Sequence, residues 1–472
     1  MADNTYNIVI SVQPKYRRWL LTPINDLQQK NQKHTKNKVE AINTRNFQAR
    51  KKGGRIEINP WDLRALPLGY TQMGLLFSKP KEPMREKETG NTLIHHFKTS
   101  LSHTLDHFPL LAGRLATTQH EDDTVSIFVD CNNSGALFRH AAAHGVTISD
   151  IIKPVYVPPI VHSFFSLNGL RGYEGITNPL LGIQITDLAD GIFIGCTINH
   201  VVADGTSLWH FFNTWSEISK GSIQLSKPPV FQRWFPDGMD IPIRIPQSCV
   251  NFKQSNEDFI PPPVQDRVFH FSKETVAKLK AKANAEIGTD KISSLQALLS
   301  HIWRCVIRNR RVDPNQQTSY RLVVGARQRL QELPDNFFGN ALMPVIVTMK
   351  AKELMEQGIG NPAWQMNRKI AAMTEESFKN MLESWPASPS FTILSNRNTL
   401  FTASSPRFIM YGNDFGWGKP IAVRGGSSVK FDGMLRLLSG AKEGSIDLEA
   451  CFSPQTLEAM ANDQEFMDTV TV

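Results

Sequence analysis

Gly191-Ile-Phe-Ile-Gly-Cys-Thr-Ile-Asn-His-Val-Val-Ala-Asp-Gly205 carries an apolar run, rich in β-branched side chains, that ends at a histidine. Such a run predicts a buried strand, and the Asp204-Gly205 pair predicts a turn after it. Thr206–Glu217 follows with large apolar residues at helical spacing. We therefore expect His200 where a core strand passes into a core helix, a junction that can hold an imidazole still.

Spacing alone leaves two interpretations of this histidine open. A neutral imidazole is a competent proton acceptor near physiological pH, so His200 is a candidate general base. A histidine beside apolar residues is more often a core residue whose polar atoms are satisfied. Asp204 is ambiguous too, because Asp-Gly is a common turn and its carboxylate could accept from the first amides of the helix.

Length and composition predict two domains. The chain has 472 residues, of which 41% are apolar, and so suits two domains of about 200 residues each. A proline-rich stretch with little periodic pattern, residues 226–265, predicts an extended crossover between them. We accordingly expect an N-terminal domain at 1–225 and a C-terminal domain at 266–472.

The N-terminal region departs from this regular pattern. Asn7–Gln13 reads as a strand, whereas Gln, Asn, Lys and Arg dominate residues 25–54 without an apolar period. That composition predicts a disordered basic insertion, and the alternative is a basic arm for nucleic acid or a membrane surface. Residues 15–55 hold 12 Lys and Arg against two acidic residues, a balance of 12 − 2 = +10. Since the net charge is +8, the remainder carries 8 − 10 = −2 and offers no footprint for a phosphate backbone.

Several classes of protein are disfavoured by what the sequence lacks. The five cysteines show no CxxC pair or Cys/His spacing, which argues against zinc and against a secreted disulfide framework. The chain shows neither a run of about 18 apolar residues nor a basic-then-apolar start. We expect a cytoplasmic protein that binds no metal, no nucleic acid and no membrane. A Walker loop, a GxGxxG after a strand and a GxSxG elbow are also missing.

A resemblance decides between the interpretations of His200. The segment His200-Val-Val-Ala-Asp204-Gly205 resembles the HxxxD signature of plant BAHD acyl-CoA-dependent acyltransferases, and Asp414-Phe-Gly-Trp-Gly418 resembles their second signature. Phe108-Pro-Leu-Leu-Ala-Gly-Arg114 and Asn336-Phe-Phe-Gly-Asn340 are similar to further family segments in the same order. The likeness covers nearly the whole chain, apart from about residues 15 to 55.

The resemblance implies an α/β protein with the two-domain chloramphenicol acetyltransferase-like fold, in which mixed sheets are flanked by helices and the active-site channel lies between the domains. Acyl-CoA would be a co-substrate and no cofactor would stay bound. His200 would be the general base of transfer to a hydroxyl or amine of a small plant metabolite. Asp204 would turn away from the substrate and pair with Arg327, so that both support catalysis. The protein would be a monomer.

The second signature is expected to shape the fold and the channel rather than to react. Asp414, Gly416, Trp417 and Gly418 are expected to form this structural motif, and its two glycines permit backbone geometry that other residues would strain. Asn340 and Trp417 are also possible donors to an oxyanion. The residues that contact coenzyme A stay unassigned. The basic cluster Arg308, Arg310 and Arg311 is expected near the C-terminal end of a helix. It either interacts with the helix dipole or binds coenzyme A phosphates.

The identity of the substrates stays open. Asn59-Pro-Trp-Asp-Leu63 and Tyr70-Thr-Gln-Met-Gly-Leu-Leu-Phe77 are similar to an acetyltransferase-like plant subgroup that does not name a substrate. Leu394-Ser395-Asn396 stands where hydroxycinnamoyl-using members carry a Thr-Ser-Trp-like triplet. Two other functions also remain open: a lyase or intramolecular acyl transfer on a small carboxylate conjugate without coenzyme A, and a catalytically silent binding protein.

Overall fold

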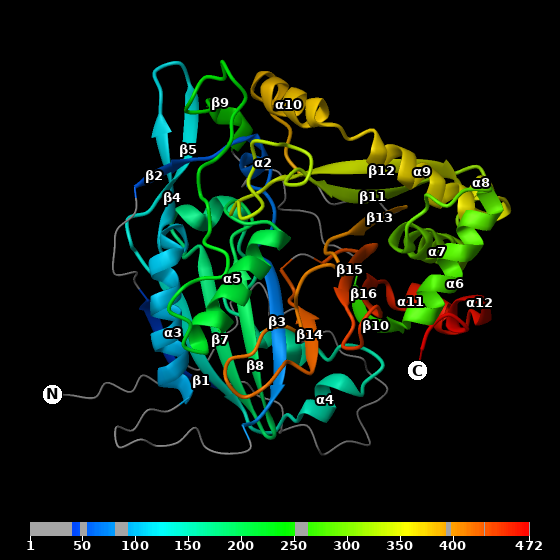
Figure 1. Cartoon of the computed structure of the whole chain (residues 1–472), viewed down its shortest axis with the longest axis horizontal. Helices are drawn as coiled ribbons and strands as arrows, with labels where there is room; N and C mark the ends of the chain where they lie inside the picture. Colours follow the sequence, from blue (N-terminus) through cyan, green and yellow to red (C-terminus); the bar gives the residue numbers. More distant parts are fainter. Residues whose placement is uncertain are drawn as a thin grey trace.

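The computed structural model describes residues 40–47, 54–80, 93–250, 263–392, 398–428 and 430–471. Their strands form two six-stranded mixed sheets and one smaller antiparallel sheet, with helices packed against them (Figure 1). The expected α/β class with mixed sheets and flanking helices is thereby confirmed. None of the helices in these ranges is both long and apolar enough to cross a bilayer.

The first sheet contains the strand that leads to His200. Adjacent strands in this sheet pair antiparallel, except β6 and β7, which pair parallel. In spatial order its strands are β1 (Glu40–Phe47), β6 (Ala136–Ala143), β7 (Leu181–Leu188), β8 (Gly191–Ile198), β3 (Thr71–Ser78) and β14 (Ala422–Gly425). Helices α3 (Leu93–His107) and α5 (Gly205–Ser219) pack against each other. All eight residues of β8 are buried, as its unbroken apolar pattern predicts.

The smaller sheet extends the N-terminal half. It contains β2 (Arg55–Glu57), β5 (Thr124–Asp130), β4 (Arg114–Gln119) and the short β9 (Ile245–Pro246), which pairs with β5. The short helices of this half are α2 (Pro60–Leu63), η1 (Pro109–Ala112), α4 (Ile148–Ile152), η2 (Pro159–Phe164), η3 (Gly172–Ile176) and η4 (Gln247–Val250). Because β9 lies within the predicted crossover, part of that segment belongs to the N-terminal half.

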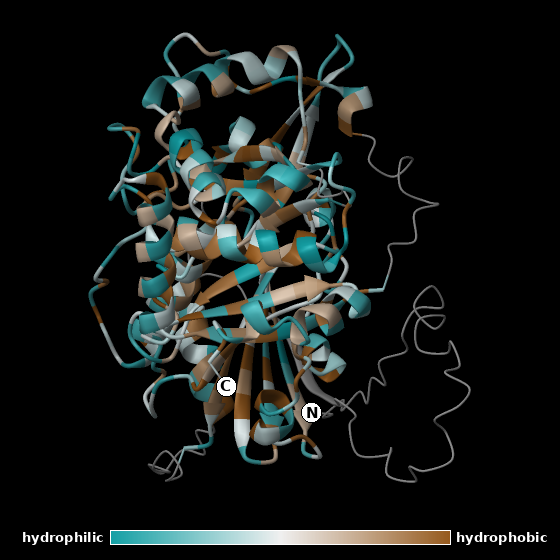
Figure 2. Cartoon of the chain, turned by 90° about the vertical axis from the view of Figure 1, so that its right-hand side faces the viewer, coloured by the Kyte–Doolittle hydropathy of each residue, from teal (hydrophilic) through white to brown (hydrophobic). Residues whose placement is uncertain are grey.

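The second six-stranded sheet is built from the C-terminal half. Its order is β10 (Gln265–Phe271), β16 (Ile446–Phe452), β15 (Met434–Ser439), β13 (Thr399–Thr402), β11 (Gln317–Gly325) and β12 (Leu342–Lys350). The accompanying helices are α6 (Lys273–Ile287), α7 (Ser294–Asn309), α8 (Ala351–Glu356), α9 (Gly360–Ala371), α10 (Glu375–Ser384), η5 (Trp385–Ala387), α11 (Pro454–Ala461) and α12 (Gln464–Met467). Figure 2 views the molecule from the right-hand side of Figure 1. The helices on this side carry both hydrophilic and hydrophobic residues, as amphipathic helices packed on a core do.

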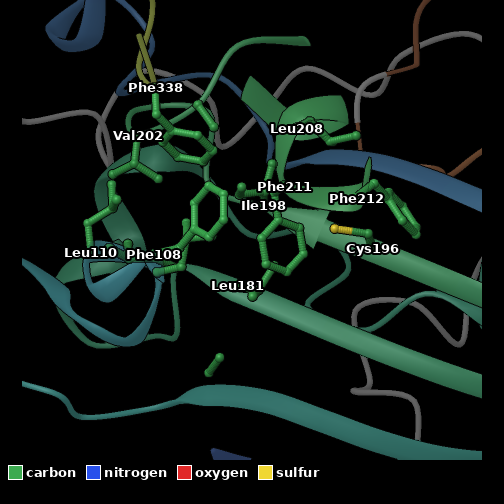
Figure 3. Packing of buried hydrophobic residues seen from close by; sticks show 14 of the residues in the cluster. Phe108, Leu110, Leu181, Cys196, Ile198, Val202, Leu208, Phe211, Phe212 and Phe338 are labelled. Atoms are coloured by element: carbon green, nitrogen blue, oxygen red, sulfur yellow. The ribbon is translucent and has the colours of Figure 1, made fainter. Parts of the chain in front are cut away.

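Each large sheet contributes to its own hydrophobic core, and the first core also takes in residues from the C-terminal half. Phe108, Phe211 and Phe338 meet in this core, with ring centroids 5.5 Å apart for Phe108 and Phe211 and 5.1 Å apart for Phe108 and Phe338 (Figure 3). Phe338 comes from the segment before β12. The segments 108–114 and 336–340, which resemble family segments in the sequence, thus contact each other in the fold.

Two features of the first sheet differ from the expectations. Residues 40–47 form β1 and pair with β6, so the expectation of a disordered loop throughout 25–54 is wrong there. The charge-rich sequence hides this strand because it has no apolar period. In addition, β14 comes from the C-terminal half and pairs with β3. The expected strand at Asn7–Gln13 and the segment Leu394–Asn396 lie outside the described residues, and the domain boundaries stay predictions.

Candidate active site

The turn that follows β8 is held by side chains on both sides of His200. Asn199 is fully buried; its Nδ2 donates to Gly172 O at 2.8 Å, and its Oδ1 accepts from Val201 N at 2.8 Å. Asn340 Nδ2 donates to His200 O at 2.7 Å and to Val201 O at 3.1 Å. The main chain of the turn is therefore fixed before any ligand arrives.

The imidazole of His200, by contrast, is not engaged by the described residues. Its Nδ1 is buried without a hydrogen-bond partner there. Its Nε2 is not among the buried unpartnered atoms and has no hydrogen bond in this part of the chain. The interpretation of His200 as a satisfied core histidine does not fit this environment, because a core histidine normally pairs its ring nitrogens.

Asp204 caps the helix that follows and faces the C-terminal half. Its Oδ1 accepts from Ser207 N at 2.9 Å, and its Oδ2 accepts from Ala341 N at 3.2 Å. Arg327 donates to the same carboxylate through Nη1 at 2.7 Å to Oδ2 and through Nη2 at 3.1 Å to Oδ1. Burial acts to raise the pKa of Asp204, but the charge and hydrogen bonds of Arg327 and the two amides outweigh it and lower that pKa.

The ion pair expected between Asp204 and Arg327 is thus present and almost completely buried, with side-chain exposures of 1% and 9%. Arg327 Nη2 also donates to Gly339 O at 3.0 Å, and its Nε donates to Phe337 O at 3.2 Å. The Ser207 hydroxyl bonds to the main chain of Gly339 as well. Arg327 therefore ties the segment 337–341 to the start of α5.

A second buried pair lies behind the turn, and spacing gave no hint of it. Arg233 Nε donates to Asp62 Oδ2 at 2.9 Å, with side-chain exposures of 1% and 0%. Asp62 Oδ1 accepts from Asn340 N at 3.1 Å and from Asn340 Nδ2 at 2.9 Å. Asp62 belongs to the quoted stretch 59–63, whose Asn59 and Pro60 mark a helix start. That local signal identifies the helix but not its distant partners.

These contacts remove Asn340 from the possible oxyanion donors. An amide group has two hydrogens, and those of Asn340 already meet three acceptors on Asp62, His200 and Val201. The main role of Asn340 in this structure is to hold the His200 turn against Asp62. Trp417 keeps a buried Nε1 without a partner in the described residues, so its status as a possible donor is unchanged.

The second signature forms a tight loop on α3 and α5. Asp414 Oδ1 accepts from Gly416 N at 2.9 Å and from Gly418 N at 3.0 Å. Gly416 and Gly418 have φ of 111° and 125°, a region that favours glycine. The Phe415 ring lies 4.9 Å from that of Trp215, and the Trp417 ring lies 5.4 Å from that of Phe97. These contacts fit a structural role, and the roles assigned to this signature stay predictions.

Two arginines of the basic cluster at the end of α7, Arg308 and Arg310, are paired with acidic residues. Arg308 Nη2 lies 2.6 Å from Asp463 Oδ2, and a further contact joins Arg308 to Glu465. Arg310 pairs with Asp432. These pairs favour the structural interpretation of the cluster over contact with coenzyme A phosphates. A metal site is not indicated either, because the described residues contain no group of three or more His, Cys, Asp or Glu side chains placed to hold an ion.

Comparisons with known proteins agree with this fold. The model of the Transferase family matches residues 11–467. An uncharacterized acetyltransferase of Arabidopsis thaliana is 40% identical over 425 residues, which cover 88% of this chain and 94% of that protein. BAHD acyltransferase DCR of Arabidopsis thaliana is 30% identical over 432 residues, 88% of either chain. The crystal structure of F. graminearum TRI101 with coenzyme A and deoxynivalenol aligns with a TM-score of 0.71 at 15% identity, covering 89% of this chain and 99% of that one.

Proposed function

The chain belongs to the Transferase family, that of the BAHD acyl-CoA-dependent acyltransferases, and on this premise we propose that it acylates a hydroxyl or amine of a small plant metabolite with His200 as general base. The acyl donor is a coenzyme A thioester, which is a co-substrate and not a bound cofactor. Support comes from the relatives named acyltransferases and from the same fold in TRI101, which was solved with coenzyme A.

The observation that carries the proposal is the contrast between the fixed main chain and the unengaged ring at His200. Asn340 and Asn199 hold the peptide groups of the turn. Asp204 is occupied by Arg327 and by the amides of Ser207 and Ala341. The imidazole therefore has no carboxylate partner among these groups and is available to a substrate proton. A base positioned in this way needs little reorganisation when the substrate reacts.

The reaction that follows needs one base and no covalent enzyme intermediate. His200 accepts the proton of the acceptor hydroxyl or amine while the acceptor oxygen or nitrogen forms a bond to the thioester carbonyl carbon. The tetrahedral oxyanion then collapses and breaks the carbon–sulfur bond, and the imidazolium returns its proton to the coenzyme A sulfur. The products are an ester or amide and free coenzyme A. A positioned general base contributes about 10²–10⁴-fold to such a rate.

The test is thiol release from acetyl, malonyl and p-coumaroyl thioesters of coenzyme A with pooled plant phenolics and amines. Wild type is compared with His200→Ala and with His144→Ala, a matched control in which the histidine is exposed. We expect acceptor-dependent release that falls by about 10²–10⁴-fold in His200→Ala, with an unchanged melting temperature, and that persists in His144→Ala.

Other outcomes would point elsewhere. Full activity in His200→Ala would contradict the role of the base. Product formed without any thioester would support a lyase, and ligand binding without thiol release or any other product would support a silent binding protein. Mass spectrometry of the products separates ester from amide and names the acyl group.

A further inference from the structure

Three separated parts of the chain meet behind the His200 turn. Asp62 belongs to α2, Arg233 to the predicted crossover, and Asn340 to the residues just before β12. Asn340 Nδ2 lies 2.9 Å from Asp62 Oδ1 and 2.7 Å from His200 O. A single amide group therefore stands between the carboxylate of Asp62 and the main chain of the candidate base.

The carboxylate of Asp62 determines which way that amide points. A carboxylate accepts hydrogen bonds and donates none, so it faces the NH2 group of Asn340 and not the carbonyl oxygen. The main-chain N–H of Asn340 also donates to Asp62 Oδ1, at 3.1 Å, which fixes the start of the side chain. If the amide were turned over, its oxygen would face the carbonyl oxygens of His200 and Val201, which lie 2.7 and 3.1 Å from Nδ2.

Arg233 holds Asp62 in this position. Arg233 Nε donates to Asp62 Oδ2 at 2.9 Å, and its Nη1 donates to Phe231 O at 3.1 Å and to Phe338 O at 2.9 Å. The exposed fraction of the side chain is 1% for Arg233 and 0% for Asp62. The two carboxylate oxygens are thus divided, because Oδ2 binds the guanidinium and Oδ1 binds Asn340. Since both side chains are buried, losing either contact leaves a polar group without bulk water to replace its partner.

We propose that Asp62 is a positioning residue for His200, which acts by orienting the Asn340 amide and has Arg233 as its counter-charge. This inference rests on the proposed acyl transfer, in which His200 takes the proton of the acceptor. Asp62 itself touches no substrate. Its contribution is to fix the main chain from which the imidazole projects, and a displacement of about 1 Å at a reacting group can cost about a hundredfold in rate.

Two double variants isolate the orienting contact from the charge. Asp62→Asn/Arg233→Met (the asparagine double variant) and Asp62→Leu/Arg233→Met (the leucine double variant) both remove the ion pair and leave no unpaired charge. Only the asparagine double variant keeps an oxygen that can accept from Asn340. Its kcat should stay near that of wild type. In the leucine double variant kcat should fall by about ten- to a hundredfold, with KM for thioester and acceptor unchanged.

The single variant Asp62→Asn gives a second, independent sign. Its one side-chain oxygen can serve either Arg233 or Asn340, and it should turn to the arginine because charge-assisted hydrogen bonds are stronger. We therefore expect a lower kcat in Asp62→Asn than in the asparagine double variant, so that removal of the arginine restores activity. A merely structural role would make the double variant no faster than the single one.

Glu449→Gln is the matched control for loss of a buried ion pair. Glu449 pairs with Arg436 at similar burial, with side-chain exposures of 1% and 9%, and it accepts from Gly425 N at 3.0 Å. Among the described residues, no hydrogen bond joins this pair to the His200 turn. Glu449→Gln should lower the melting temperature and leave kcat unchanged. All rates are measured well below the melting temperature and per folded molecule.

Two results would overturn the inference. One is an equal kcat in the asparagine and leucine double variants, and the other is a double variant no faster than Asp62→Asn. If the leucine double variant does not fold, the comparison of Asp62→Asn with the asparagine double variant decides alone. If neither double variant folds, Asp62→Asn is compared with Glu449→Gln, and an unchanged kcat in both would refute the positioning role.

A measurement on the imidazole separates this failure from that of the acyl-transfer proposal. In protein with isotope-labelled histidine, the magnetic resonance signals of the His200 ring are identified by their loss in His200→Ala. If no thioester reacts, these signals should still move in the leucine double variant. They should keep their wild-type positions in the asparagine double variant and in Glu449→Gln. Unmoved signals in the leucine double variant would refute the positioning role on its own terms.

Discussion

Replacing Arg327 by methionine should destabilise the protein far more than loss of an ordinary ion pair would. The methionine keeps much of the apolar stem but leaves Asp204 with the amides of Ser207 and Ala341 only. Because the two side chains are 1% and 9% exposed, the remaining carboxylate stays desolvated. Removing one partner of such a buried pair costs about 3–5 kcal/mol. An unfolding entropy of about 2.1 cal/mol/K per residue gives about 1 kcal/mol/K for 472 residues, so the melting temperature should fall by about 3–5 °C.

A matched control distinguishes burial from charge. Arg244 pairs with Asp122 at 3.4 Å, but their side chains are 52% and 57% exposed. Exposed pairs contribute little to stability, so Arg244→Met should leave the free energy of unfolding nearly unchanged. Calorimetry and urea unfolding measure the stability of both variants, and thiol release measures their rates of acyl transfer. In Arg327→Met we expect slower acyl transfer as well, since the segment 337–341 and the His200 turn lose a common anchor.

A double-mutant cycle completes the test. Asp204→Asn/Arg327→Met removes both charges, so its cost should be smaller than the sum of the single costs by about 0.5–3 kcal/mol. Strict additivity, or an Arg327→Met variant no less stable than Arg244→Met, would show that the pair does not act as we infer.

Two further predictions concern buried polar residues. Asn340→Ala removes the donor to His200 O and one of the two bonds that Asp62 accepts from Asn340, so calorimetry should show a loss of about 1–3 kcal/mol and kinetics a lower kcat. Burial lowers the pKa of His301 to about 4, whereas an unfolded histidine titrates near 6.5, so the unfolded chain takes up this proton first and stability falls between about pH 6.5 and 4. In His301→Gln this loss should shrink by roughly 3 kcal/mol in pH-dependent urea unfolding, and an unchanged pH profile would contradict the assignment.

The elements that the sequence predicts well are those whose signal is local. The run 191–198 and the helix after Asp204 appear where periodicity and the turn place them. The pair of Asp204 with Arg327 was expected only because of a family resemblance, since no spacing rule joins residues 123 positions apart. The network of Asp62, Arg233 and Asn340 was not predicted, although its residues lie in quoted or neighbouring segments. Arg233 and Asn340 lie 171 and 278 positions after Asp62 in the sequence, and only the packed fold brings the three residues together.

The same limit explains the two strands that were missed or misplaced. A polar edge strand such as β1 has no apolar period to detect. The short β14 is fully buried and four residues long, too short for a pattern to show which sheet it joins. For Asn340 the sequence predicted too much. An asparagine can donate to an oxyanion, but the structure shows that its amide hydrogens already bond to Asp62, His200 and Val201.

The pairing of β14 with β3 also affects how the protein can be made. Ala422 follows Ser78 by 422 − 78 = 344 positions. A ribosome adding about 5–20 residues per second therefore needs about 17–70 s to supply the strand that covers one edge of the first sheet. During that interval β3 presents unpaired main-chain groups to other nascent chains, the kind of edge that promotes aggregation. Chains that stop before residue 422 would keep that edge permanently, so premature termination should give insoluble fragments rather than an independent N-terminal half.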